Sequence, residues 1–150
     1  MIEPASTRGE LRTYLGIAPG VGKTYAMLRD GRAKRRSGID AVVAYWERHG
    51  RAATAAQLGG LDVFPTRTVT YRGTSFEELD VDGVLRRLPE LALVDELAHA
   101  NLPGERYAKR WQDVEELLSQ GVNVATTLNV ANLESLGRLV GLEDHRHPSG

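Results

Sequence analysis

The sequence predicts an α/β fold, with a mostly parallel sheet of about five strands flanked by helices. Short apolar or β-branched runs alternate with longer stretches of helical periodicity, and this alternation is typical of a parallel sheet with helices on its faces. With 150 residues, of which 41% are hydrophobic and 26% charged, the chain has the size and composition of one globular domain. The expected strands are residues 11–16, 41–46, 67–71, 91–95 and 122–127.

The helices follow from apolar spacing and from the glycines at their ends. The first is expected over 23–37, a stretch without proline that Gly38 follows as a helix C-cap. The second is expected over 106–121, where four apolar residues share one helical face because they recur at steps of four, three and four. These four residues are Tyr107, Trp111, Val114 and Leu118. A shorter helix is expected over 129–140.

Composition excludes several classes of protein. The formal net charge is −1, so no overall field attracts the chain to nucleic acid or to a membrane surface. The chain contains no cysteine, which excludes a disulfide framework and a thiolate zinc site. The first residues do not form a secretory signal, and no apolar run is long enough to span a bilayer. We therefore expect a cytoplasmic protein with no nucleic-acid partner and no membrane insertion by this chain. The single domain is expected over residues 1–142, with 143–150 as a flexible tail or a cut end.

The stretch GIAPGVGKT, residues 16–24, follows the first expected strand and resembles a Walker A phosphate-binding loop. Five residues separate Gly16 from Gly22 here, one more than the usual P-loop spacing. Glycines let the backbone approach phosphates closely, and the start of the next helix attracts an anion. The alternative is a tight strand-to-helix turn whose lysine faces solvent and binds no nucleotide. The nucleotide-binding candidates are Gly16, Gly20, Val21, Gly22, Lys23, Thr24 and Tyr25.

A second motif, which is acidic, strengthens the prediction of a nucleotide site. LALVDE is an apolar strand that ends in Asp95 and Glu96, the arrangement of a Walker B segment. We expect Thr24 and Asp95 to hold Mg²⁺ and Glu96 to polarise a water molecule. Asn129 is a candidate sensor of the γ-phosphate, with a helix-capping role as the equal alternative. Together the motifs predict a P-loop NTPase-like fold that binds ATP and Mg²⁺.

Two positively charged residues lie at a helix start, where the helix dipole disfavours positive charge. Lys109 and Arg110 are near the start of the second expected helix, whose positive end disfavours positive charge. Residues that are unfavourable locally often serve a function. We therefore expect this basic turn to have a binding role.

The motifs together resemble one family, the N-terminal cytoplasmic domain of the KdpD osmosensitive potassium-channel sensor histidine kinases. The resemblance covers residues 9–142 and includes the longer spacing of the phosphate loop. It implies a nucleotide-binding input domain of a two-component system in potassium homeostasis. The sequence departs from the family pattern at Ala100, Tyr107 and 131–132. The stretches that carry the resemblance are APGVGKTYAML (18–28), ERHGR (47–51), YRG (71–73), LVDELAHAN (93–101), PGERYAKRWQDVEELL (103–118) and TTLNVANLESL (126–136).

Three functions compete at this point. The preferred one is a regulatory ATP-binding module that contacts other domains of a sensor kinase or a separate signalling protein, hydrolyses ATP slowly or not at all, and has no autokinase activity by itself. The alternative is a free-standing small P-loop ATPase or metabolite kinase. The third is an α/β scaffold without a nucleotide, which requires the glycine and acidic motifs to coincide by chance.

Overall fold

The core of the molecule is a five-stranded sheet with the strand order β1-β7-β6-β2-β3. All of its neighbouring strands pair in parallel, which confirms the α/β fold with a mostly parallel sheet. The structure is a computed structural model, and it describes residues 7–16, 21–46, 56 and 58–132. The strands are β1 Leu11–Gly16, β2 Ala41–Tyr45, β3 Asp62–Val63, β6 Leu91–Val94 and β7 Asn123–Asn129.

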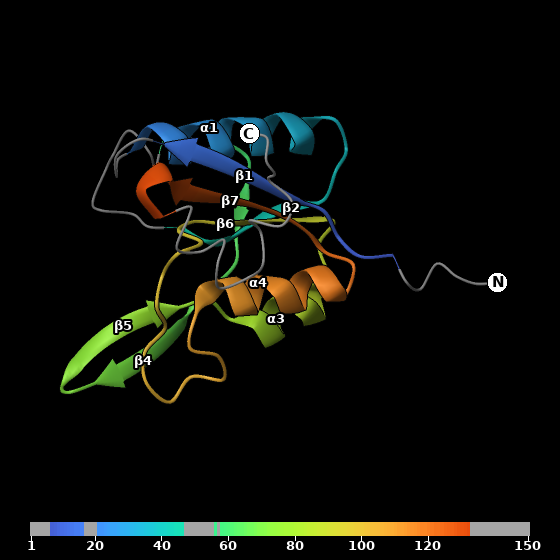
Figure 1. Ribbon diagram of the computed structural model, residues 1–150. Helices are drawn as coiled ribbons and strands as arrows, with labels where there is room; N and C mark the ends of the chain where they lie inside the picture. The colour runs from blue at the N-terminus through green and yellow to red at the C-terminus, as the bar shows by residue number, and fades with distance from the viewer. Residues whose placement is uncertain (1–6, 17–20, 47–55, 57, 133–150) are drawn as a thin grey trace, which may run out of the picture.

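Helices cover both faces of this sheet (Figure 1). Helix α1 (Val21–Arg36) lies on one face, whereas α3 (Val81–Arg87) and α4 (Arg110–Ser119) lie on the other. Each face has its own apolar cluster, one that includes side chains from α1 and one that includes side chains from α3 and α4. Strands β2 and β6 are buried along their whole length, as their continuous apolar sequences AVVAY and LALV predict for central parallel strands.

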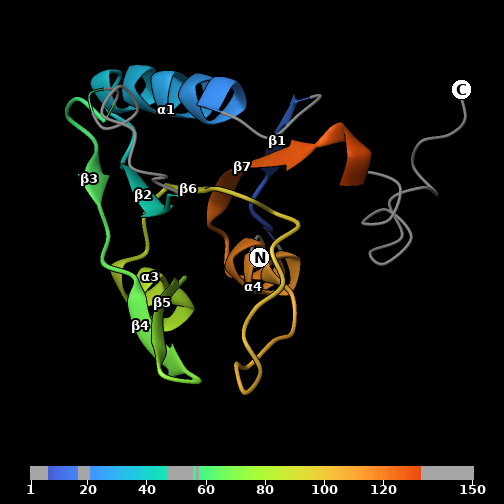
Figure 2. The same ribbon diagram turned by 90° about the vertical axis from the view of Figure 1, so that its left-hand side faces the viewer.

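The prediction that residues 67–71 belong to the parallel sheet was wrong. They form β4 (Arg67–Tyr71), which pairs antiparallel with β5 (Thr74–Glu78) in a separate two-stranded sheet. The hairpin extends away from the body of the molecule, as the two ribbon views agree (Figures 1 and 2). Arg72 and Gly73 both have positive φ, 52° and 78°, as a two-residue hairpin turn requires. Strand β3 takes the fifth place in the main sheet.

The second helix starts later than its apolar spacing predicts. Helix α4 begins at Arg110 and ends at Ser119, so residues 106–109 precede it. Helix α3, which is capped by the Asp80 side chain on Gly83 N at 3.1 Å, was not predicted. After β7 the chain forms a 3-10 turn, η2 (Val130–Asn132), and the rest of the helix expected over 129–140 lies outside the described residues. Among the helices that the structure describes, none is long and apolar enough to cross a membrane.

Candidate functional site

The carboxyl ends of the parallel strands meet at one edge of the sheet, where ligands bind in open α/β sheets. Helix α1 starts at Val21, shortly after the end of β1. Lys23 and Thr24 are in its first turn, and they are only 8% and 7% exposed. A buried lysine at the start of a helix makes a strongly anion-attracting position.

Asp95 follows β6 directly and makes contact with Thr24. The Thr24 hydroxyl lies 3.0 Å from Asp95 Oδ1 and 3.3 Å from Oδ2. Thr127 of β7 donates a second hydroxyl hydrogen bond to Asp95 Oδ1, at 2.6 Å. The carboxylate is 1% exposed, and the two hydroxyls hold it at the start of α1. Thr24 and Asp95 lie in contact because the strands that position them end at the same edge of the sheet.

The chain turns sharply after Asp95. Glu96 has a left-handed backbone with φ 64°, which is uncommon for a residue other than glycine. Its amide donates to the Thr127 hydroxyl at 2.9 Å, and the amide of Leu97 donates to the Thr127 carbonyl, also at 2.9 Å. Thr127 therefore fixes both the carboxylate of Asp95 and the turn that presents Glu96.

The other expected ligand-binding residues are distributed around this centre. Asn129 is the register partner of Gly16 at the ends of β7 and β1. Its Oδ1 is buried and has no hydrogen-bond partner among the described residues, so an acceptor is available there. A Cβ at Gly22 would meet open space, and Tyr25 is 41% exposed. Gly20 lies outside the described residues, as does the side chain of Val21.

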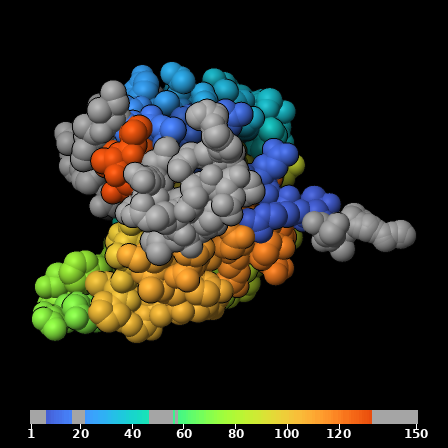
Figure 3. Space-filling view, in the orientation of Figure 1, coloured from blue at the N-terminus to red at the C-terminus, as the bar shows by residue number. Residues whose placement is uncertain are grey.

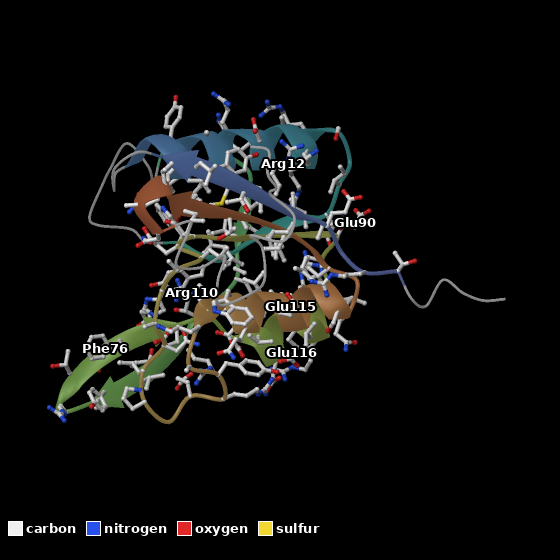
Figure 4. All side chains as sticks on the ribbon, in the orientation of Figure 1. Arg12, Phe76, Glu90, Arg110, Glu115 and Glu116 are labelled. Carbon is white, nitrogen blue, oxygen red and sulfur yellow. The ribbon has the colours of Figure 1, made fainter. Side chains whose placement is uncertain are left out.

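A buried ion pair lies behind Asp95, and sequence reasoning did not find it. Arg110, the first residue of α4, is 0% exposed and donates to the Asp95 main-chain carbonyl at 3.0 Å. Its other terminal nitrogen lies 3.3 Å from Glu78 Oε1, and its guanidinium stacks on the Tyr45 ring at 3.8 Å. The binding role expected for the basic turn of Lys109 and Arg110 does not hold for Arg110, because its side chain is buried and its terminal nitrogens contact Asp95 and Glu78 (Figure 4).

A further buried carboxyl, beside those of Asp95 and Glu78, belongs to α4. Asp113 is 8% exposed and accepts a hydrogen bond from Asn101 Nδ2 at 2.8 Å. Burial raises the pKa of the Asp113 carboxyl to about 6, although the hydrogen bond from Asn101 and the charge of Arg110 oppose that shift. This face of the sheet therefore contains a carboxyl whose pKa burial raises well above its ordinary value.

The arrangement suits a phosphate ligand with a hard cation. Lys23 and the α1 start supply positive charge, and Thr24 and Asp95 supply adjacent oxygens of the kind that Mg²⁺ prefers. Within the described part of the chain, no three His, Cys, Asp or Glu side chains form a metal cluster. Mg²⁺ at Asp95 would therefore need further oxygens from a ligand, as is usual when it binds with a nucleotide phosphate.

Comparison with known proteins identifies the family. The profile of the KdpD family, described as the osmosensitive K⁺ channel His kinase sensor domain, matches residues 7–143. The chain belongs to this family. It is 54% identical over 141 residues to the sensor protein KdpD of Mycobacterium tuberculosis, a match that covers 93% of this chain and 16% of the relative.

Other KdpD proteins give the same picture. The sensor protein KdpD of Escherichia coli K12 is 52% identical over 136 residues, which are 91% of this chain and 15% of that protein. A putative sensor protein KdpD of Synechocystis is 47% identical over 137 residues, 91% of this chain and 37% of its own length. The chain spans about one sixth of the first two relatives. The resemblance found in the sequence motifs is confirmed.

Proposed function

We propose that this KdpD sensor domain binds ATP together with Mg²⁺ and acts as a regulatory input module. In a longer sensor kinase for potassium or osmotic signalling, nucleotide occupancy would change its contacts with the other kinase domains or with a separate signalling protein. We also propose a cytoplasmic location, because the cytoplasm supplies ATP.

One observation carries the proposal: the contact between Thr24 and Asp95 at the start of α1. The hydroxyl and the carboxylate, 3.0 Å apart, come from two motifs that are 71 residues apart in the sequence. Chance would not bring a Gly-Lys-Thr turn and a strand-ending aspartate together at the ligand-binding edge of a parallel sheet. In the proposed complex, Lys23 binds the β- and γ-phosphates, Thr24 and Asp95 hold Mg²⁺, and Asn129 lies near the γ-phosphate.

The roles of the remaining residues follow from their positions. The glycine-rich stretch from Gly16 to Gly22 would supply backbone amides to the phosphates, including those of Gly20 and Val21. Tyr25 would lie beside the nucleotide on the exposed side of α1. Mg²⁺ would supply charge neutralisation of the phosphates, and Glu96 would orient a water molecule toward them.

The test is the melting temperature as a function of Mg-ATP concentration. At about a hundred times its dissociation constant a ligand adds roughly 2.7 kcal/mol to stability, which corresponds to roughly 5–10 °C for a chain of this size. We expect Lys23→Ala to abolish this rise. Lys34→Ala is the matched control because Lys34 lies in the last turn of the same helix, and it should keep the full rise. If Mg-ATP does not raise the melting temperature of the parent protein, the proposal is wrong.

The alternative is a free-standing ATPase or metabolite kinase. It is supported by Glu96, which directly follows Asp95 with a left-handed backbone and could orient a water molecule for hydrolysis. Steady phosphate release separates the two functions. Common enzymes turn over at about 1 per second or faster, and we expect this domain to be slower. A faster rate that Glu96→Gln abolishes would favour the enzyme.

A further inference from the structure

The main-chain carbonyl of Asp95 has a polar partner from outside the sheet. Strand β6 ends at Val94, whose register partner in β7 is Thr126. With the left-handed backbone of Glu96, the chain departs from the sheet direction immediately afterwards. A buried carbonyl at such a point needs a donor, and Nη1 of Arg110 provides it at 3.0 Å.

Arg110 is itself held from several sides. Its guanidinium stacks on Tyr45 at the end of β2 and pairs with Glu78, the last residue of β5. Glu78 is 3% exposed and also contacts His99 Nε2 at 3.2 Å and the Leu102 amide at 3.3 Å. Figure 4 shows Arg110 where the start of α4, the base of the hairpin and the sheet come together. The guanidinium thus has little freedom to move away from Asp95.

A buried arginine at the start of a helix is a less favourable way to fill this volume than an apolar side chain. The start of a helix repels a cation, and buried ion pairs often contribute less stability than apolar side chains of the same volume. The side-chain contacts of Arg110 are the Asp95 carbonyl, the Glu78 carboxylate and the Tyr45 ring. A leucine or methionine could fill the same volume but could not donate to the Asp95 carbonyl, so the guanidinium at this position indicates a directional role.

We infer that Arg110 is a positioning residue for the Mg²⁺ site. By holding the Asp95 carbonyl, it fixes the backbone that directs the Asp95 carboxylate toward Thr24, and Glu78 fixes Arg110 in turn. The β4–β5 hairpin is thereby linked at its base to the metal-binding carboxylate. This inference rests on the proposed ATP and Mg²⁺ binding, and it adds the residues that set the affinity for the metal.

The experiment measures the Mg²⁺ concentration that gives half-maximal ATP binding, and separately the ATP affinity at saturating Mg²⁺. The variants are Arg110→Met and Arg110→Met with Glu78→Gln, the second of which also removes the Glu78 charge that would otherwise be buried without its cation. Changes behind a metal ligand typically weaken metal binding 10–100-fold. We expect both variants to need at least about tenfold more Mg²⁺, with the ATP affinity at saturating Mg²⁺ close to that of the parent protein.

Two further variants separate positioning from stability. Leu117→Ala removes a fully buried side chain of the same helix that has no polar contact with Asp95, and it should leave the Mg²⁺ requirement unchanged. Arg110→Lys keeps the charge but not the fork that reaches two acceptors, so it should fall between the parent and Arg110→Met.

The outcomes are distinct. An unchanged Mg²⁺ requirement in the double variant, an equal increase in Leu117→Ala, or ATP binding by the parent protein that does not depend on Mg²⁺ would each overturn the inference while ATP binding stands. A parent protein that does not bind ATP at all would overturn the proposed function, and the inference with it.

Discussion

The two faces of the sheet are built differently. On the α1 face, the buried cluster consists of apolar side chains such as Met27, Leu28 and Leu93, and the polar pair Tyr14 and Asp30 lies at the edge, with 2.7 Å between hydroxyl and carboxylate. The α3 and α4 face has an apolar cluster and, in addition, a buried arginine and buried carboxyls. Both faces pack against β6, the strand that Asp95 follows directly.

The difference separates two tasks of the fold. The α1 face presents the start of its helix at the proposed ligand site, and its buried cluster is apolar. The α4 face approaches the same aspartate from behind and contains charges that are unfavourable inside a protein. The β4–β5 hairpin joins this face at its base. In Figure 3 the hairpin protrudes from the body of the molecule. We therefore expect removal of a buried charge to change the free energy of unfolding strongly on the α4 face. Removal of a buried leucine should have a similar cost on both faces.

The largest effect should come from breaking the buried ion pair. Arg110→Met leaves the Glu78 carboxylate buried without its cation, and such a loss typically costs about 3–5 kcal/mol of unfolding free energy. Adding Glu78→Gln removes the stranded charge, so the double variant should regain most of that loss. Urea denaturation at pH 7.5 measures both values.

Glu115→Gln serves as the control for charge removal, since Glu115 is on the same helix but pairs with Arg8 at the surface. Exposed pairs contribute little, and the midpoint should barely move. If the double variant were as unstable as Arg110→Met, the Arg110 contacts with Asp95 and Tyr45, rather than the stranded Glu78 charge, would dominate the loss.

The next effect compares matched leucines on the two faces. Leu28 in α1 and Leu117 in α4 are both 0% exposed, and alanine is favourable in a helix. Each Leu→Ala change should cost about 3 kcal/mol, within the usual range for a buried leucine, and the two costs should agree to within about 1 kcal/mol. A much smaller loss at Leu28, by the same denaturation measurement, would mean that α1 is packed less tightly than α4.

The features set by local sequence were predictable. Apolar runs placed β1, β2, β6 and β7 to within a few residues, and the shared edge of a parallel sheet then brought Thr24 to Asp95. The hairpin was missed because Arg72, rather than a residue that favours positive φ, occupies the first turn position. The burial of Arg110 was missed because its partner Glu78 lies 32 residues away in the sequence, and nothing in the local pattern of α4 points to it.

The smallest of the expected effects concerns Asp113. Its folded pKa of about 6 lies above the reference value of 3.8, chiefly because of burial. The folded protein therefore binds this proton more readily than the unfolded chain does, and this group makes stability fall as the pH rises from about 4 to 6. Above pH 6 the buried charge is a fixed cost.

Asp113→Asn should remove that cost, because the amide keeps an acceptor for Asn101 Nδ2 without a charge. At pH 7.5 the variant should be more stable than the parent protein, by on the order of 1 kcal/mol, and the advantage should disappear near pH 4. Denaturation midpoints from pH 4 to 8 measure this difference, with Glu115→Gln as the exposed control on the same helix. If Asp113→Asn were instead less stable at pH 7.5, the attraction between the Asp113 charge and Arg110 would outweigh burial, and the α4 face would tolerate its charges better than its apolar surroundings imply.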